Sequence, residues 1–273
     1  MTTAETQNCA PNSALHRVPR RPHAWIWLAL ALHLGAILVW WRWGWAPGLA
    51  CLFATHMLFL WGTMRPQSRL FGPVLSRLPI REKAVWLTVD DGPSHETQAL
   101  LELLDRHDAK ATFFLVADRA AARPELAREI LRRGHGIGNH SRSHPQAWFW
   151  ALGPRRMAAE IDQAQATLRD LTGQAPRWFR AVVGMANPFV SAPLKKNGLT
   201  RVAWSARGFD GVAGQPDKVV ARIVGDLQPG AIVLLHEGAA HGHNLAIIEG
   251  VLQAMKQQGY RAILPEAAGR GYV

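Results

Sequence analysis

Hydrophobic residues follow three patterns along this chain, and each pattern predicts a different kind of element. Residues 24–41 and 45–64 are almost wholly apolar, and each run is close to the roughly 20 residues that a helix needs to cross a bilayer. From residue 84 onward, short apolar runs alternate with stretches that carry apolar residues at three- and four-residue steps. The short runs indicate buried strands, and the stretches between them indicate amphipathic helices.

The alternation of these elements predicts an α/β fold. The predicted strands comprise residues 84–89, 111–116, 135–139, 178–180, 201–205, 231–235 and 261–264. The predicted helices comprise residues 97–107, 124–133, 154–171, 191–196, 216–227 and 244–258. Such strict alternation favours a parallel sheet with helices outside it. A closed α/β barrel and an open doubly wound sheet both fit, although no glycine-rich dinucleotide-binding motif favours the second.

We interpret the two long apolar runs as a pair of membrane-spanning helices. The alternatives are two buried core helices or, for the first run, an uncleaved signal peptide, although residues 1–23 are a long stretch to precede a signal peptide's apolar core. Four tryptophans cluster where the two runs adjoin, as in an interfacial aromatic belt: Trp40, Trp41, Trp43 and Trp45. Only Arg42 lies between the runs, whereas both outer flanks carry several basic residues, so the positive-inside rule predicts that both ends are cytoplasmic.

The predicted organisation is that of a two-pass protein of the bacterial inner membrane with a cytoplasmic catalytic domain. It comprises a basic tail over residues 1–23, two transmembrane helices over 24–64, a basic linker over 65–83 and the catalytic domain over 84–273.

Net charge narrows the choice of partner. A formal charge of +11 indicates an acidic partner, and the basic residues cluster beside the apolar runs, which fits an anionic membrane surface. No basic helix, zinc-finger spacing or aromatic RNA-binding motif is present, so we expect no nucleic acid to bind. The two cysteines, Cys9 and Cys51, are badly placed for a disulfide and lie far in sequence from the polar motifs, so any metal site must use histidine and carboxylate.

Two short motifs carry the candidate chemistry. Asp90 and Asp91 end the first predicted strand, and His140 and His144 follow about fifty residues later. A catalytic metal usually has about three protein ligands and keeps positions open for water and substrate. One aspartate and both histidines meet that number, which leaves the other aspartate to accept a proton from water. The plain alternatives are a turn after a strand and two surface histidines.

Further polar residues stand at the ends of other predicted strands. Arg180, Asp210 and His236 each come at or just after a strand, as Asp90 and His140 do. In parallel α/β folds the carboxyl ends of the strands carry the chemistry. Convergence of several such positions favours an active site over the plain alternatives.

At this point the chain resembles the polysaccharide deacetylase family, with its NodB homology domain of carbohydrate esterase family 4, from about Val85 to Leu264. Thr88 to Pro93 resembles the first family motif, with Val89 in place of an aromatic residue, and His140 to His144 meets the second. The third motif is partly met, because Val182 replaces a proline between Arg180 and Gly184. In the fourth, Trp204 and Asp210 keep the spacing but Gly211 stands where an aromatic residue is common, and residues 233–236 resemble the fifth.

The resemblance implies a distorted (β/α)7 barrel and a role for each matched residue. Asp90 would be the general base, and Asp91, His140 and His144 would bind one divalent metal ion. Arg180 would orient the base, His236 would be the general acid, and Asp210 would tune that histidine. Trp204 and Gly184 would contact substrate. Zinc is the first expectation for the metal, with iron, cobalt and manganese as alternatives.

The expected function is therefore hydrolysis of an N-acetyl or N-formyl group on an amino sugar. The cytoplasmic orientation and basic membrane flanks suggest a membrane-associated or lipid-linked glycan as substrate. The alternative is a catalytically silent carbohydrate-binding or assembly protein of the inner membrane. The sequence predicts neither the sugar nor the oligomeric state.

Overall fold

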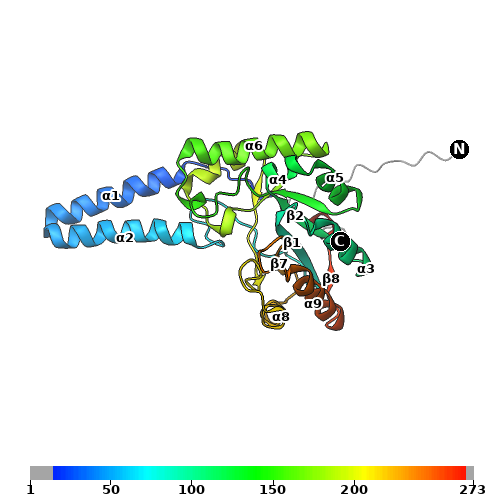
Figure 1. Cartoon of the computed structure of the whole chain (residues 1–273). Helices are drawn as coiled ribbons and strands as arrows, with labels where there is room; N and C mark the ends of the chain where they lie inside the picture. The colour runs from blue at the N-terminus through cyan, green and yellow to red at the C-terminus, as the bar shows by residue number, and fades with distance from the viewer. Residues whose placement is uncertain (1–14, 269–273) are drawn as a thin grey trace.

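A helical hairpin projects from an α/β body in the computed structural model, which describes residues 15–268 (Figure 1). The hairpin consists of α1 (Ala24–Trp43) and α2 (Trp45–Met64). The strands of the body are β1 (Ala84–Gly92), β2 (Ala111–Leu115), β3 (Gly136–Asn139), β4 (Trp178–Phe179), β5 (Thr200–Arg201), β6 (Ala206–Arg207), β7 (Ile232–His236) and β8 (Arg261–Ala262). Its helices are α3 (Thr97–Arg106), α4 (Ala117–Ala122), α5 (Pro124–Arg132), α6 (Pro154–Thr172), α7 (Ser191–Lys196), α8 (Pro216–Gly225) and α9 (Asn244–Gln257).

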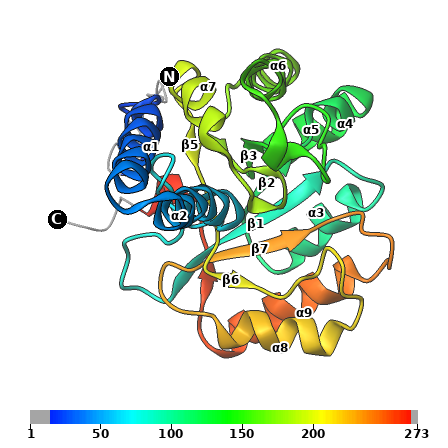
Figure 2. The same cartoon turned by 90° about the vertical axis from the view of Figure 1, so that its left-hand side faces the viewer.

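The strands form one parallel sheet in the order β5-β4-β3-β2-β1-β7-β6, and β8 pairs with the start of β1. Helices surround it, with α8 and α9 on one side and α4, α5 and α6 on the other (Figure 2). Because side chains alternate along a strand, β1 divides its residues between two faces. Val85, Leu87 and Val89 pack into the core beneath the helices, whereas Trp86 belongs to a second cluster on the inner face. By the same alternation, the side chain of Asp90 points to the inner face of the curved sheet, as that of Trp86 does.

The parallel α/β architecture confirms the predicted fold class, but the seven-stranded barrel needs correction. In place of the single strand predicted over 201–205, β5 ends at Arg201 and β6 begins at Ala206, and these two strands are the edges of the hydrogen-bonded path. A segment that precedes β1 pairs with the chain after β5: Leu75 N donates to the Arg201 carbonyl at 2.9 Å, and the Leu75 carbonyl accepts from Ala203 N at 2.8 Å. The residues from β1 to β8 therefore form a half-barrel and not a closed barrel.

The linker and the described end of the tail both pack on the body. In residues 65–83, Phe71, Leu75 and Leu78 are buried. In the tail, Leu15 is buried and Arg17 N donates to Thr200 Oγ1 at 2.8 Å, while residues 1–14 lie outside the described part of the chain. Apolar side chains spaced along both segments supply this contact, so the hairpin is attached to the body by folded chain at both of its ends.

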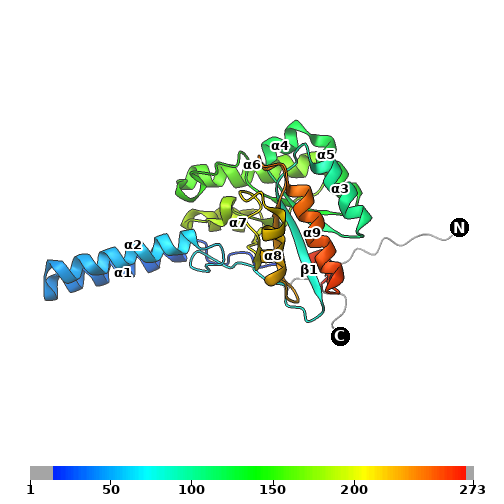
Figure 3. The same cartoon turned by 60° about the horizontal axis from the view of Figure 1, so that its bottom comes forward.

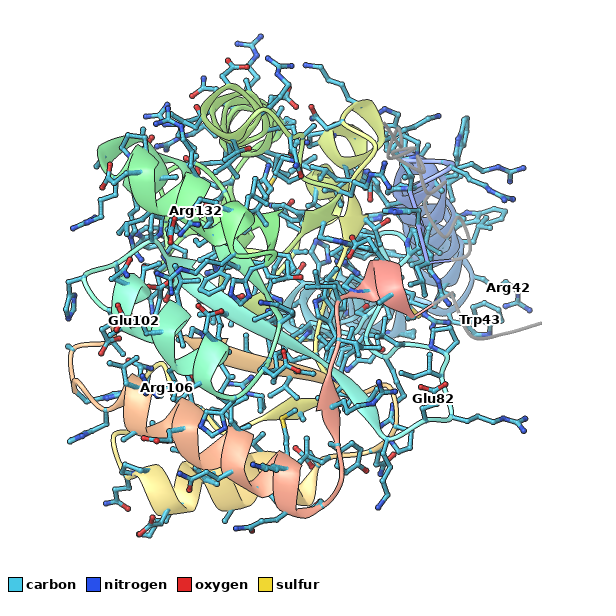
Figure 4. All side chains as sticks on the ribbon, turned by 90° about the vertical axis from the view of Figure 1, so that its right-hand side faces the viewer. Arg42, Trp43, Glu82, Glu102, Arg106 and Arg132 are labelled. Carbon is cyan, nitrogen blue, oxygen red and sulfur yellow. The ribbon has the colours of Figure 1, made fainter. Side chains whose placement is uncertain are left out.

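The hairpin itself contacts the body only at its base (Figure 3). Both helices are long and apolar enough to cross a membrane, and only 6% of the first span and 22% of the second are buried inside the chain. Their apolar side chains therefore face outward rather than into a core of this molecule. Arg42 and Trp43 lie at the turn farthest from the body and are labelled in Figure 4, where Glu102 and Arg106 point to solvent from α3.

Candidate active site

Most of the predicted site residues meet at the carboxyl ends of the strands. Asp90 and Asp91 lie at the end of β1, His140 directly follows β3, Arg180 directly follows β4, and His236 ends β7. Asp90 and His236 are paired across β1 and β7 in the sheet register. The structure thus brings together residues from four strands, as the strand-end argument predicted.

Asp91, His140 and His144 form the candidate metal centre. Their ligand atoms all lie within 4.8 Å of one another. Asp91 Oδ1 is 2.9 Å from His144 Nε2 and 3.5 Å from His140 Nε2. His140 Nδ1 lies 2.9 Å from the carbonyl oxygen of Arg180. Because a carbonyl oxygen can only accept, Nδ1 carries the proton, and Nε2 of the neutral ring presents a lone pair to the centre.

The donor set fits a divalent cation. Asp91 Oδ1 is buried and has no well-directed hydrogen bond from any residue between 15 and 268. Burial acts to raise the pKa of Asp91, but hydrogen bonds and positive charge from His140 and His144, where those rings are protonated, hold that pKa well below its usual range. When both rings are neutral, the set offers two imidazole nitrogen atoms and one carboxylate oxygen to an ion, which suits zinc, iron, cobalt or manganese.

A turn brings the two histidines together. Their i, i+4 spacing would also have placed both rings on one face of a helix, but the segment is not helical. His144 N donates to Ser141 Oγ at 3.1 Å, and Ser141 N donates to Asn139 Oδ1 at 3.0 Å. Side-chain acceptors of this kind stabilise a backbone that is neither helix nor strand. The turn places both rings side by side, with centroids 5.0 Å apart.

Backbone strain is concentrated around this centre. Six non-glycine residues between 15 and 268 have a positive φ, and all but Asp108 lie at the site: Asp91, Ser141, His144, Val183 and Phe209. For a β-branched residue such as Val183, with φ 56°, this conformation is a genuine outlier. Strained residues persist where the surrounding structure holds them, and they cluster at active sites.

Arg180 holds Asp90 in place. The guanidinium is fully buried and donates from Nη1 to Asp90 Oδ1 and to Thr88 Oγ1, each at 2.7 Å. It lies over the Phe114 ring at 4.2 Å. Burial lowers the pKa of Arg180, whereas the charge of Asp90 acts against that change. The second carboxylate oxygen of Asp90, Oδ2, does not bind Arg180. It lies 3.8 Å from His140 Nε2 and so faces the candidate metal centre.

Asp210 holds His236 in the same manner from the loop after β6. Its Oδ1 lies 3.0 Å from His236 Nδ1, and its Oδ2 accepts from the His236 backbone N at 2.6 Å. Burial lowers the pKa of His236, but the Asp210 carboxylate outweighs it through charge and hydrogen bonding and raises that pKa to about 9. The ring is therefore protonated at neutral pH, and its Nε2–H is available as a proton donor.

One pocket joins these groups. Asp90, Asp91, His140, His144 and His236 line it together with Trp204 and Gly184, the two predicted substrate contacts. A Cβ atom on Gly184 would lie 2.4 Å from Trp204 Cη2 and 2.7 Å from Pro66 Cγ, so only glycine fits there. Pro66 comes two residues after α2 ends, which places the pocket wall against the base of the hairpin.

Sequence reasoning missed several lining residues: Gln146, Val183, Arg207, Phe209 and Val212. Arg207 ends β6, so the strand-end rule would have found it if that two-residue strand had been recognised. Val183 lies in a single 3-10 turn, and the other three lie in loops, where no periodic pattern marks a residue as part of a site.

Glu237, which follows His236, is a further residue that the sequence did not single out. Its Oε2 accepts from Ser94 Oγ at 2.7 Å and Ser94 N at 3.2 Å, and its own backbone N donates to the Asp90 carbonyl at 3.2 Å. Burial raises the pKa of Glu237, although hydrogen bonds from Thr97 and Ser94 oppose that change. These contacts tie the turn after β1 to the end of β7, and so they fix the distance between the base and acid candidates.

Comparison with known proteins agrees with this geometry. The family model for polysaccharide deacetylases matches residues 78–202. The chain is 32% identical over 192 residues to a chitooligosaccharide deacetylase of Bradyrhizobium, which covers 70% of this chain and 87% of that protein. It is 32% identical over 182 residues to a peptidoglycan-N-acetylglucosamine deacetylase of Listeria monocytogenes, which covers 66% of this chain but only 38% of that protein.

A solved structure shows the same fold. The family 4 carbohydrate esterase from Streptomyces lividans, in complex with acetate, superposes with a TM-score of 0.61 at 33% identity and covers 68% of this chain and 95% of its own. The family expected from the motifs is thus confirmed: the chain belongs to the polysaccharide deacetylase family and is an enzyme of the deacetylase kind.

Proposed function

We propose that this enzyme hydrolyses the N-acyl group, acetyl or formyl, of an amino sugar, with Asp90 as general base and His236 as general acid. The observation that carries the proposal is that one pocket holds both a group that can accept a proton and a group that can donate one. Arg180 donates a hydrogen bond to Asp90 and so orients that carboxylate, while Asp210 keeps His236 protonated. Amide hydrolysis needs both, because water must lose a proton and the departing amine must gain one.

The chain's own residues account for the proton movements. Asp90 Oδ2 accepts the proton of the attacking water, and Arg180 stabilises the carboxylate until then. His236 donates its Nε2 proton to the leaving nitrogen, and Asp210 stabilises the ring in both states. Asp91, His140 and His144 would hold a divalent metal ion, which when bound polarises the amide carbonyl as a Lewis acid. The alternative of a silent carbohydrate-binding protein is disfavoured, because each of these positions keeps a competent side chain.

The substrate class follows in part from the relatives. Those named above act on chitooligosaccharide and on the N-acetylglucosamine of peptidoglycan, so an N-acetylglucosamine unit is the first candidate for the sugar. We propose further that the sugar is presented at the cytoplasmic surface of the inner membrane, with α1 and α2 spanning the bilayer. The outward-facing apolar side chains of the hairpin, and the contact of its base with the pocket wall through Pro66, support this placement.

Exposed apolar side chains at the pocket also support a membrane-associated substrate. Outside α1 and α2, the large hydrophobic residues that are exposed between residues 15 and 268 are Trp148, Val183, Phe209 and Val212, which we call the apolar rim. Val183, Phe209 and Val212 line the pocket, and Trp148 lies two residues after the pocket residue Gln146. Exposed apolar groups gathered at one place mark a contact with lipid, ligand or protein. Beside an anchored hairpin, a lipid-bearing substrate is the simplest such contact.

The purified full-length protein in detergent tests the reaction itself. We expect acetate release from N-acetylglucosamine oligomers, and Asp90→Asn should lower kcat by about 100- to 10,000-fold, the usual contribution of a general base. Metal content should be equal in the two proteins. Asp217→Asn, on the solvent side of α8, is the matched control and should keep full activity. Turnover by the Asp90→Asn protein at the wild-type rate would remove Asp90 as the base.

A further inference from the structure

Arg207 is a pocket residue to which neither the family motifs nor the proposed proton transfers assign a role. It ends β6 and lines the same pocket as Asp90 and His236. Its guanidinium lies 3.8 Å from the ring centroid of Phe209 and 5.2 Å from that of Trp204. Two aromatic rings against one guanidinium hold its plane in a fixed orientation at the wall of the pocket.

The other cationic groups at the site, Arg180 behind the pocket and His236 in it, have carboxylate partners. Arg180 pairs with Asp90, and His236 pairs with Asp210. Arg207 makes no ion pair with any carboxylate between residues 15 and 268, and its Nε is buried without a hydrogen-bond partner there. Burial also lowers the pKa of Arg207, with Asp210 acting against that change. A half-buried guanidinium with open donor positions is poorly stabilised until an anion completes its hydrogen bonds.

The surroundings of Arg207 favour one kind of anion. Phe209, whose ring contacts its guanidinium, and Val212 belong to the apolar rim, so an anion bound here would share one pocket with both the proton-transfer residues and apolar side chains. A phosphate that joins a sugar to a lipid has a polar group and an apolar group as its two neighbours in the same way. The fork of a guanidinium also matches phosphate oxygens in a bidentate manner.

We propose that Arg207 binds a phosphate group of the substrate, so that the enzyme prefers amino sugars that carry a phosphate to neutral glycans. The inference rests on the proposed deacylation and adds to it the chemical class of the substrate. The phosphate belongs either to a lipid linkage or to a free sugar phosphate, and both present the same oxygens to Arg207.

A matched pair of soluble probes tests the contact. N-acetylglucosamine 1-phosphate and methyl N-acetylglucosaminide share the acetamido group, and the first carries a phosphate where the second carries a methoxy group. Wild-type enzyme should show the higher kcat/KM with the phosphate probe. Arg207→Gln should lose about 10- to 100-fold more with the phosphate probe than with the neutral one, mainly through KM, as expected for a charged hydrogen bond. Arg207→Lys should recover part of the loss because it keeps the charge.

Arg222→Gln is the matched control. The Arg222 guanidinium lies 6.0 Å from the centroid of the same Phe209 ring, but Arg222 does not line the pocket. Its replacement should therefore lower kcat/KM for both probes equally or for neither. Binding of inorganic phosphate supplies a readout without turnover: it should raise the Tm of the wild-type and Arg222→Gln proteins and leave that of Arg207→Gln unchanged.

The outcomes separate this inference from the proposed function. Equal losses with the two probes, together with an equal phosphate-dependent Tm shift in wild type and Arg207→Gln, would show that Arg207 only packs the wall, and would overturn the inference. Failure of wild type to hydrolyse either probe or any acylated amino sugar would overturn the deacylation, while the Tm shift would still report on Arg207. Polyprenyl-phosphate-linked N-acetylglucosamine in vesicles identifies the source: a higher kcat/KM than for the free sugar phosphate assigns the phosphate to a lipid linkage, and an equal value assigns it to the free sugar.

Discussion

At the scale of single residues, Asp210 determines both the position and the charge of His236. One carboxylate oxygen contacts Nδ1 and the other accepts from the backbone N, so ring and main chain are held by the same group. This fixes the tautomer and aims Nε2 into the pocket, as the carboxylate does for histidine in many hydrolases. The negative charge also keeps the ring protonated at a pH where free imidazole is mostly neutral.

This dependence predicts a change in the pH profile of Asp210→Asn. Because the pKa of His236 is raised to about 9, the protonated acid is present below that pH, and kcat/KM should fall as the pH rises through about 9. Asparagine removes the charge that raises the pKa, so the alkaline limb should move to lower pH by about one unit or more. The measurement is kcat/KM against pH with a neutral N-acetylglucosamine oligomer.

Two controls make the shift specific. Asp217→Asn changes a carboxylate on α8 and should leave the alkaline limb in place. His236→Ala should remove that limb altogether while also lowering the rate. If Asp210→Asn lowers activity uniformly without moving the limb, His236 is not the group that titrates, and its role as the acid fails.

The residues that could be predicted from the sequence are those tied to recognisable strands. Asp90, His140 and Arg180 each follow an apolar run, and the carboxyl ends of parallel strands must meet at one edge. Arg207 could not be predicted as a site residue, because β6 has only two residues and gives no recognisable strand pattern. The apolar rim could not be predicted either, because no sequence pattern distinguishes an exposed valine or tryptophan of this kind from a core residue.

At the scale of elements, the predictions succeed where a segment has a clear hydrophobic period and fail where it has none. Helices α3, α5, α6, α8 and α9 lie close to their predicted ranges, because each buries one face and so shows a clear helical period. Helix α4 was missed, since six alanine-rich residues carry too little periodicity. The packing of residues 65–83 against the chain after β5 and before β7 could not be predicted, because it depends on how the sheet curves.

The hairpin gives a prediction about topology. Basic residues flank both outer ends and only Arg42 lies at the turn, so both ends should remain on the cytoplasmic side. Alkaline phosphatase, which is active only outside the cytoplasm, should therefore be inactive when fused after Val273. When it is inserted at Gly44, in the turn between α1 and α2, it should be active.

The two fusions serve as controls for each other, provided that immunoblots show equal amounts of protein. Activity of the fusion at Val273 together with inactivity at Gly44 would invert the topology and place the pocket on the outer side. Activity at neither site would show that α1 and α2 do not cross the membrane.

At the scale of the whole molecule, hydrogen bonds connect the hairpin to the pocket. Ala186 N donates to the carbonyl of Thr63 at 3.1 Å, and Gln67 Nε2 donates to the carbonyl of Trp204 at 2.8 Å. Hydrogen bonds thus join the last turn of α2, and the chain that follows it, to two walls of the site. With α1 and α2 in a bilayer, the pocket would be held near the membrane surface instead of moving on a free tether.

The apolar rim would then meet lipid-bearing substrates but contribute little to soluble ones. We expect the double variant Trp148→Gln, Val212→Asn to lose about 10-fold or more in kcat/KM with polyprenyl-linked N-acetylglucosamine in vesicles, because these two side chains are 67% and 78% exposed and would lose their contact with the lipid. The loss with a soluble N-acetylglucosamine oligomer should be clearly smaller. A matched polar change far from the pocket, Glu102→Gln on the exposed side of α3, controls for general effects on stability. Equal losses on both substrates would mean that the rim supports the fold of the pocket and does not contact lipid, and the site would then serve soluble glycans.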